Sequence, residues 1–287
     1  MKYRFISDHR EKMKVGLMCN SLHVSRSAYY SWSKRPESRR NLENRALEDK
    51  IRVLHAASHS IYGSPRIHRD LIDDGTSCGK NRVARIMREA GIRSRTKKKF
   101  KATTNSKHKL PVAPNLLNQN FTAADRDLVW VGDITYIWTD EGWLYLATLI
   151  DLFNREVVGW ATSSRINRQL TIEALLMALG RRNPGSGLLH HTDRGSQYAS
   201  LDYQKILKDH DMICSMSRKG NCYDNAVAES FFGRLKTEWV NHHRYPSRSE
   251  ASLSLFYYIE IFYNRKRRHS SVDYATPQEY EVFPLEA

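Results

Sequence analysis

Residues 128–138 read Leu-Val-Trp-Val-Gly-Asp-Ile-Thr-Tyr-Ile-Trp, an apolar and aromatic run with a single acid, Asp133, in its middle. β-Branched and aromatic residues at this density are typical of a strand. A carboxylate inside such a strand is energetically costly unless it binds something. The run therefore predicts a strand, and it makes Asp133 a candidate functional residue.

The sequence after this run continues with the pattern of short strands separated by turns. A turn at 140–142 leads into an apolar stretch over 143–152, and a turn at Asn154 leads into another over 156–161. Strands joined by such brief connections form an antiparallel meander. Beyond them the expected elements are a helix over 170–179, a strand from Leu188 to Asp193, a helix over 201–209, a strand over 212–216, a helix over 224–240 and a last amphipathic helix over 249–264 before a basic tail. This order predicts an α/β fold, a mixed five-stranded sheet flanked by helices.

Residues 1–93 have the pattern of short helices instead. Ser25 is an expected N-cap, and further helices are expected near 47–57, after Ser64 and around 83–87. Two short helices around a tight turn are what a helix-turn-helix needs, because one helix braces the other in a DNA major groove. The positions expected to be exposed on the last of these helices are basic: Lys80, Arg82, Arg85 and Arg88. The alternative is a helical bundle with a solvated basic face.

The positive charge of the chain is concentrated in its front half. Among 287 residues, 46 Lys and Arg outnumber 31 Asp and Glu, which gives a net charge of +15 and a pI near 9.7. Residues 1–124 hold 27 basic and 10 acidic side chains, whereas the remainder holds 19 and 21. With 40% apolar residues, this composition excludes an acidic disordered chain and indicates a polyanionic partner. DNA binding by the helical front is therefore the better hypothesis.

Residues 94–124 connect the two halves without helical or strand periodicity. Lys97, Lys98 and Lys99 belong to a basic cluster around Phe100, and polar residues and two prolines follow. Two interpretations stay open, a flexible basic tether and an arm that contacts DNA phosphates. The expected organisation is a helix-turn-helix-like DNA-binding region over 1–93, a linker over 94–124 and an α/β core over 125–287.

Several other classes of protein are not indicated. No stretch approaches the ~18 consecutive apolar residues that span a bilayer, and no apolar run follows the basic N-terminus as in a secretory signal. The four cysteines form no CxxC pair, which favours reduced thiols in a cytoplasm. His55 and His59 have the spacing of half a zinc site, but without a nearby cysteine pair we interpret them as helix-surface histidines. We expect a cytoplasmic protein with no membrane partner.

Two further acids join Asp133 as candidates. Asp193 ends a buried-looking strand and precedes Arg-Gly-Ser-Gln, a turn that leaves backbone open to a ligand. Glu229 lies on the long helix, where it shares a face with Asn225 and Lys236 away from the apolar stripe. Taken singly, an acid is more readily a salt-bridged or solvated carboxylate, and this is how we interpret Asp151, Asp224 and Glu238.

Carboxylates that converge repel one another, and a divalent cation relieves that repulsion. Oxygen ligands suit Mg²⁺, which keeps several waters and shares its shell with phosphate. Two such ions ~3.5–4 Å apart activate the attacking oxygen and stabilise the leaving one in phosphoryl transfer. The three acids thus indicate phosphoryl transfer if they meet at one edge of the sheet.

Three blocks surround these acids: WVGDITY over 130–136, HTDRGSQY over 191–198 and DNAVAESFF over 224–232. Thirty-five residues separate Asp193 from Glu229, and Lys236 follows Glu229 by seven positions. The blocks and the D,D-35-E spacing resemble the integrase-core transposases of the DDE superfamily, most closely the second-reading-frame product of the insertion-sequence-three family. Further matches extend the resemblance over nearly the whole chain, at 24–30, 62–67, 215–217, 220–221, 263–270 and 276–277.

This resemblance implies an RNase H-like integrase core and a DNA transposase that cuts and joins strands at the ends of an insertion sequence. It implies that two Mg²⁺ ions, with Mn²⁺ as a substitute, are held by Asp133, Asp193 and Glu229. One ion would be shared by Asp133 and Asp193, and the other by Asp133 and Glu229. Lys236 is expected to contact DNA phosphate. The other candidate DNA contacts are Asn225, Lys97, Lys98, Lys99, Arg82 and Arg85. Water or a DNA 3′-hydroxyl would be the nucleophile.

The expected partners are the terminal repeats of the element, target DNA and further copies of the chain. Family members often act as frameshift fusions in which an upstream product supplies another helix-turn-helix and a leucine zipper, whereas this sequence shows no heptad run. The chain is then either the catalytic half of such a fusion or partnership, or complete by itself. We expect it at the nucleoid of a bacterial cytoplasm.

Two other functions stay open. One is a non-catalytic DNA-binding regulator or domesticated transposase remnant, although all three acids and Lys236 are present. The other is an RNase H-type nuclease, against which the 35-residue spacing and the basic front argue.

Overall fold

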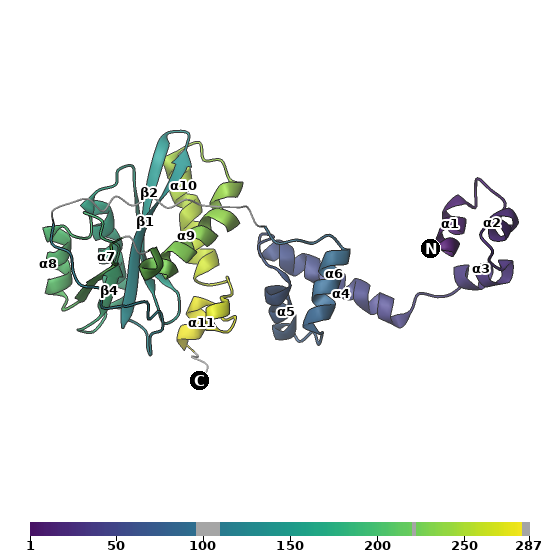
Figure 1. The fold of residues 1–287 in the computed structure, drawn as a ribbon, viewed down its shortest axis with the longest axis horizontal. Helices are drawn as coiled ribbons and strands as arrows, with labels where there is room; N and C mark the ends of the chain where they lie inside the picture. Colours follow the sequence, from purple (N-terminus) through teal and green to yellow (C-terminus); the bar gives the residue numbers. More distant parts are fainter. Residues whose placement is uncertain (96–109, 220–221, 283–287) are drawn as a thin grey trace.

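The computed structural model describes residues 1–95, 110–219 and 222–282. The chain begins with a small bundle of α1 (Lys2–His9), α2 (Val15–Ser21) and α3 (Arg26–Ser33), which lies apart from the rest of the molecule (Figure 1). This bundle has its own small buried cluster, made of Ile6, Met18, Cys19 and Tyr29. The predicted cap is confirmed, since the Oγ of Ser25 accepts a hydrogen bond from the amide of Ala28 at 3.3 Å.

A second helical unit contains α4 (Arg39–Ala57), α5 (Ser64–Asp73) and α6 (Lys80–Glu89). Helix α4 begins well before its predicted start near residue 47. Ser38 caps it by accepting a hydrogen bond from the amide of Asn41 at 3.3 Å. The turns that follow this cap are polar, and a helix without an apolar stripe leaves no periodic signal in the sequence.

The remainder of the chain is built on one mixed sheet of five strands in the order β3-β2-β1-β4-β5. The first three strands, β1 (Val129–Thr139), β2 (Gly142–Asp151) and β3 (Val157–Ser163), pair antiparallel, so the predicted meander is confirmed. The short strands β4 (Leu189–Thr192) and β5 (Ile213–Met216) run parallel to β1. The predicted mixed α/β architecture is therefore confirmed.

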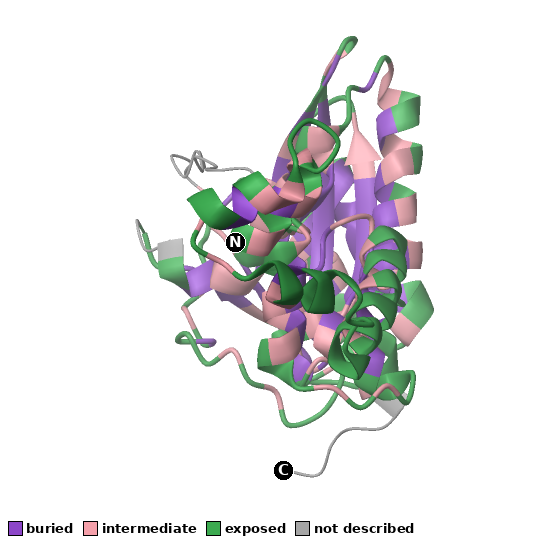
Figure 2. Ribbon diagram, turned by 90° about the vertical axis from the view of Figure 1, so that its right-hand side faces the viewer, coloured by how far each residue is buried: buried purple, intermediate pink, exposed green. Residues whose placement is uncertain are grey.

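Helices cover both faces of this sheet (Figure 1). On one face lie α7 (Arg168–Arg182) and α8 (Leu201–Asp209), and on the other α9 (Ala226–Glu238) and α10 (Arg248–Phe256). Gly159 of β3 permits the close approach of α7, because a Cβ there would lie 2.3 Å from the carbonyl oxygen of Ala174. Figure 2 shows the strands as a buried layer between helices whose outer surfaces are exposed.

The helices of the last third differ from prediction at their ends. The helix expected over 224–240 begins at Ala226, because residues 222–225 form the 3₁₀ turn η1 (Cys222–Asn225). The helix expected over 249–264 changes at Tyr257 into the π-helical stretch η3 (Tyr257–Tyr263). The remaining elements are η2 (Val240–His242), η4 (Ser270–Val272) and α11 (Pro277–Val282). No helix of the described ranges is both long and apolar enough to cross a membrane.

Residues 110–124, the described second half of the expected linker, pack on the sheet domain. Leu117 is buried in the cluster that contains α9, with Phe121 and Ala123 against the same cluster. The Oγ of Ser215 accepts hydrogen bonds from the amides of Leu116 and Leu117 at 2.9 and 3.3 Å. A flexible tether is therefore wrong for this half. Lys97, Lys98 and Lys99 lie outside the described residues.

The predicted basic tail after residue 264 is wrong for Arg267 and Arg268, which are folded into the protein, whereas Arg265 and Lys266 are exposed. Arg267 is fully buried and donates hydrogen bonds from Nη2 and Nε to the two carboxylate oxygens of Glu238, at 2.5 and 2.7 Å. Arg268 forms ion pairs with Asp70 and Asp73 of α5. The Arg268 pairs join the C-terminal segment to the second helical unit, and the Arg267 pair joins it to α9.

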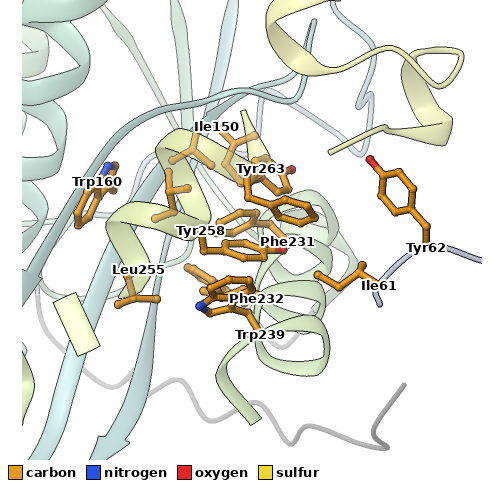
Figure 3. Close-up of a cluster of buried hydrophobic side chains, with 14 of the residues drawn as sticks. Ile61, Tyr62, Ile150, Trp160, Phe231, Phe232, Trp239, Leu255, Tyr258 and Tyr263 are labelled. Atoms are coloured by element: carbon orange, nitrogen blue, oxygen red, sulfur yellow. The ribbon is translucent and has the colours of Figure 1, made fainter. Parts of the chain in front are cut away.

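The second helical unit and the sheet domain share one buried cluster. Figure 3 shows Ile61 beside the aromatic group that includes Phe231 and Trp239 of the α9 region, and Tyr62 belongs to the same buried cluster. His59 also lies in this junction, with its ring centroid 5.1 Å from that of Trp239, so interpreting it as a helix-surface histidine is wrong. The junction backs the same helix that carries Glu229.

Candidate active site

Asp133 and Asp193 are brought together by the pairing of β1 with β4. In that parallel register Gly132 lies opposite Thr192. The residues that follow them, Asp133 and Asp193, therefore lie side by side where β4 ends. Gly132 leaves room for the buried side chain of His190, since a Cβ there would lie 3.1 Å from Cε1 of that ring. The register of the sheet therefore forms the acidic pair.

Backbone amides fix the two carboxylates. The Oδ1 of Asp133 accepts a hydrogen bond from the amide of Ile134 at 2.8 Å, and the Oδ1 of Asp193 accepts one from the amide of Gly195 at 2.8 Å. At Gly195 a Cβ would lie 3.0 Å from this same oxygen, so a larger residue would disturb the turn. Both aspartates are half-buried, and in each the neighbouring backbone amide orients the carboxylate.

Helix α9 contributes the other candidates. Glu229 is half-buried in the first turn of α9, where the helix dipole favours a negative charge. Asn225, just before the helix, donates from Nδ2 to the carbonyl oxygen of Gly132 at 3.1 Å and is only 5% exposed. Asn225 thus positions α9 against β1, and the DNA contact expected of it stays a prediction.

Lys236 reaches the same region from two turns further along α9. The residue is 8% exposed, and its Nζ lies 4.5 Å from the ring centroid of Tyr136 on β1. Burial lowers the pKa of Lys236 to about 8, while the negative charge of Asp133 acts in the opposite direction. The lysine therefore shares the electrostatic field of the acidic pair.

The pKa of Asp133 indicates that Asp193 and Glu229 lie close enough for their charges to affect its carboxylate. Burial raises the pKa of Asp133 well above its usual value, and the charges of Asp193 and Glu229 raise it further. The Ile134 amide and Lys236 oppose this shift only in part. Burial also raises the pKa of Glu229. Among the described residues, no group of three or more His, Cys, Asp or Glu side chains has a geometry ready to hold a metal ion.

The acids interpreted as ordinary carboxylates have structural partners. Asp151 caps the turn after β2 by accepting from the amides of Asp127 and Phe153 at 2.8 and 2.9 Å, and burial raises its pKa to about 6. Asp224 is fully buried, and its hydrogen bonds with Arg218 hold its pKa well below the usual range. Glu238 is the partner of Arg267. The structural interpretation of Asp151, Asp224 and Glu238 is confirmed.

The basic candidates on α6 are less exposed than predicted. Arg82 is half-buried, donates from Nε to Oδ1 of Asn44 at 2.8 Å and lies 3.6 Å from Glu43. Arg85 is half-buried and pairs with Glu89 at 3.0 Å. These two arginines have protein partners on α4 and α6 and are half-buried, so the exposure expected of them is wrong, while their DNA contacts stay a prediction.

Sequence reasoning missed the aromatic support behind the acidic pair. The hydroxyl of Tyr198 is buried without a hydrogen-bond partner in the described part of the chain, and its pKa is raised by burial, by Tyr203 and by the charges of Asp133 and Asp193. Tyr203 in turn lies 2.8 Å, hydroxyl to Nε2, from His190. Tyr198 belongs to the HTDRGSQY block, which was the available signal, but periodicity does not indicate that its buried hydroxyl lies close enough to both acids to be affected by their charges.

Comparison with family models matches three segments of the chain. An integrase core domain matches residues 124–222, a second integrase core domain model matches 210–277, and an HTH-like domain matches 42–100. The HTH-like match begins within α4 and includes α5 and α6, while α1 to α3 lie before it.

Curated relatives match the chain over nearly its whole length. It is 47% identical over 263 residues to the uncharacterized 31 kDa protein of insertion element IS600 from Shigella sonnei, covering 92% of this chain and 97% of that protein. It is 42% identical over 283 residues to transposase InsF for insertion sequence IS3A from Escherichia coli strain K12, covering 98% of each.

Solved structures with lower similarity also match. The simian T-cell lymphotropic virus intasome in complex with a PP2A regulatory subunit has 17% identity and a TM-score of 0.48, covering 80% of this chain and 74% of that one. The HTLV-2 integrase catalytic core domain in complex with magnesium has 17% identity and a TM-score of 0.43, covering 55% of this chain and 97% of that one.

Proposed function

The chain belongs to the IS3 family of insertion-sequence transposases, enzymes with an integrase core, and from this premise we propose that it catalyses Mg²⁺-dependent DNA strand cleavage and strand transfer at the ends of its element. The observation that supports this most is the placement of Asp133 beside Asp193, with Glu229 and Lys236 acting on the same carboxylate. A half-buried group of like charges destabilises the folded chain, which indicates a functional reason for it.

The donor set suits magnesium. All three candidate ligands are carboxylates, and a cation would offset both the burial and the repulsion that raise the pKa of Asp133. Because no described trio already has ligand geometry, binding through all three acids requires them to draw together. We propose two ions, with Mn²⁺ as a substitute. When bound, they would activate the attacking oxygen and stabilise the leaving one.

The protein's own residues have separable roles in this proposal. The amides of Ile134 and Gly195 orient Asp133 and Asp193, so that each presents its carboxylate at the same edge of the sheet. Lys236 contacts a DNA phosphate next to the acids, which would restore its full positive charge. The attacking group is water in cleavage and a DNA 3′-hydroxyl in joining.

We further propose how the rest of the chain serves this site. Residues 1–93 bind the element end, and residues 94–124 connect them to the catalytic core of 125–287. More than one protomer assembles on DNA, because two element ends must be joined. The upstream-reading-frame product, as a fusion or a separate partner, would add a further DNA reader. Such a protein acts at the nucleoid in the bacterial cytoplasm.

The experiment uses a labelled duplex that ends in the terminal repeat of the element encoding the chain. With Mg²⁺ we expect shortened and joined products. Asp133→Asn, Asp193→Asn and Glu229→Gln should each abolish these products while DNA affinity stays within a few-fold. Asp209→Asn, an exposed acid at the end of α8, is the matched control. Binding without any product in the unaltered chain would favour the alternative, a non-catalytic regulator or domesticated remnant.

A further inference from the structure

A pocket of about 530 Å³ lies between the tip of the β1–β2 hairpin and the segment 240–245. Its volume falls in the range of roughly 300–1,000 Å³ found for sites of small ligands. The residues of this hairpin pocket that carry the argument are Tyr136, Trp138, Trp143, Lys236 and Arg244. Lys236 is shared with the active site, so the pocket adjoins the acids.

Three aromatic rings form one wall of the hairpin pocket. Trp138 and Trp143 are directly paired across the hairpin, and Tyr136 lies on the same face because side chains alternate along a strand. The ring centroid of Trp143 lies 4.9 Å from that of Tyr136 and 4.8 Å from that of Trp138. Trp138 is 58% exposed and Trp143 is 43% exposed. Large aromatic surface exposed in this way indicates a binding site.

Hydrogen bonds between the β1–β2 hairpin and the segment after α9 hold the two sides of the pocket in place. The amide of Asp140 at the hairpin tip donates to the carbonyl oxygen of Tyr245 at 2.9 Å, and Nε of Arg248 donates to the carbonyl oxygen of Trp143 at 3.0 Å. At the rim, Arg244 pairs with Asp140 at 3.1 Å and remains largely exposed. These contacts fix the position of the aromatic wall relative to Lys236 and to Arg244 at the rim.

We propose that the hairpin pocket binds one unpaired base of the DNA strand on which the acids act. Single-stranded nucleic acids are bound by aromatic side chains on which bases stack, combined with cations that follow the backbone. Here the aromatic rings supply the stacking surface, while Lys236 and Arg244 complement the flanking phosphates. In an intact duplex each base is stacked between its neighbours, so only a base that has left its pair can use this wall.

This inference rests on the proposed function, because that function places DNA at the acids. The unpaired base can come from the element end or from the target DNA. The chemistry of recognition is the same in both, so the experiment needs one arm for each source.

The test compares fully paired duplexes with duplexes that carry mismatches beside the reacting position, one set for the element end and one for target DNA. Binding is measured in Ca²⁺, so that the result does not depend on chemistry. The unaltered chain should prefer the opened duplex in at least one set, because mismatches remove the free energy of unpairing. Given the strength of base–aromatic stacking, we expect a preference of about five-fold or more.

The pocket variants show whether this preference belongs to the aromatic wall. Trp138→Ala and Trp143→Ala should bind opened and paired duplexes equally, whereas Trp138→Phe and Trp143→Phe should keep the preference. Phe256→Leu, an exposed aromatic on α10, is the matched control and should keep it as well. Unchanged melting temperatures would show that the alanine variants are folded.

Two outcomes would overturn the inference. One is an equal preference for opened DNA in the alanine variants and the unaltered chain. The other is a change in the association state of the protein without any change in DNA preference, which would make the wall a protein contact. If opened-duplex preference follows the tryptophans but no cleavage occurs in Mg²⁺, the pocket stands and the proposed function fails.

Discussion

Asn225 ties the start of α9 to strand β1, through a hydrogen bond from its Nδ2 to the carbonyl oxygen of Gly132 at 3.1 Å. Gly132 immediately precedes Asp133, and Asn225 precedes Glu229 by about one helical turn. The bond therefore sets the distance between the strand and helix that supply the first and third acids. Register places Asp133 beside Asp193, and this bond brings α9 alongside them.

Asn225→Ala should weaken both the fold and the reaction. The substitution leaves the carbonyl of Gly132 without its buried partner, which costs about 1–3 kcal/mol of unfolding free energy. Strand transfer should fall by more than stability explains, because Glu229 is no longer held. Urea unfolding and product yield measure the two effects. Asn20→Ala, an exposed asparagine of α2, is the control. Full activity in Asn225→Ala would contradict a positioning role.

Asp133→Asn should stabilise the metal-free chain while abolishing strand transfer. Burial and the charges of Asp193 and Glu229 raise the pKa of Asp133 in the folded state, so its ionised form opposes folding. This penalty is present above the folded pKa and disappears as pH falls below the unfolded value. We therefore expect a melting temperature a few degrees higher at about pH 8, with the gain lost near about pH 4.

Added Mg²⁺ separates this effect from a general stabilisation. The unaltered chain should gain melting temperature with Mg²⁺, because a bound cation removes the repulsion, whereas Asp133→Asn should gain little. Asp209→Asn serves again as the exposed control. If Asp133→Asn melts lower than the unaltered chain at about pH 8 without metal, the three acids do not repel one another as the pKa of Asp133 indicates.

DNA binding should depend on pH through Lys236. Burial lowers the pKa of this lysine to about 8, so its charged fraction falls as pH rises through that value. Affinity for the terminal repeat should fall several-fold between about pH 7 and about pH 9.5, and Lys236→Arg should flatten the decline, because guanidinium stays charged. Lys205→Arg, on the exposed surface of α8, should leave the decline unchanged. A parallel decline in Lys236→Arg would place the titrating group elsewhere.

The elements predicted well are those whose burial has a simple period. The strand that carries Asp133 is almost continuously apolar, because helices cover both faces of the sheet. The brief turns on either side of β2 identify the antiparallel meander. The placement of Glu229 and Lys236 on one side of a helix follows from helical spacing alone. Such local rules also place the Ser25 cap correctly.

The features that were missed depend on contacts between distant parts of the chain. A run of arginines near residue 267 has the composition of a solvated tail, and only the bidentate pairing with Glu238 makes its burial favourable. Likewise, the packing of Leu117 depends on Ser215, almost one hundred residues away. The aromatic wall of Trp138 and Trp143 could be placed on one face from sequence, but its position beside Lys236 required the folded structure.

The junction between the second helical unit and the sheet domain leads to a last prediction, on Tyr62. Its hydroxyl donates to the carbonyl oxygen of Lys266 at 2.9 Å and accepts from the amide of Arg268 at 2.8 Å. Tyr62→Phe removes one oxygen and leaves both backbone groups unpaired, at a cost of about 1–3 kcal/mol each where they stay dry. The junction should therefore loosen at these two hydrogen bonds, while the apolar cluster that the two units share stays packed.

We expect Tyr62→Phe to raise hydrogen exchange at residues 59–62 and 266–268 and to lower strand transfer several-fold, because the junction backs the helix that carries Glu229. Binding of the terminal repeat should change little, since the substitution removes no positive charge. Tyr30→Phe, on the exposed surface of α3, is the matched control. Should strand transfer stay normal while exchange rises, the docking of the helical unit would be structural only, and α9 would hold Glu229 in place without the contacts of the junction.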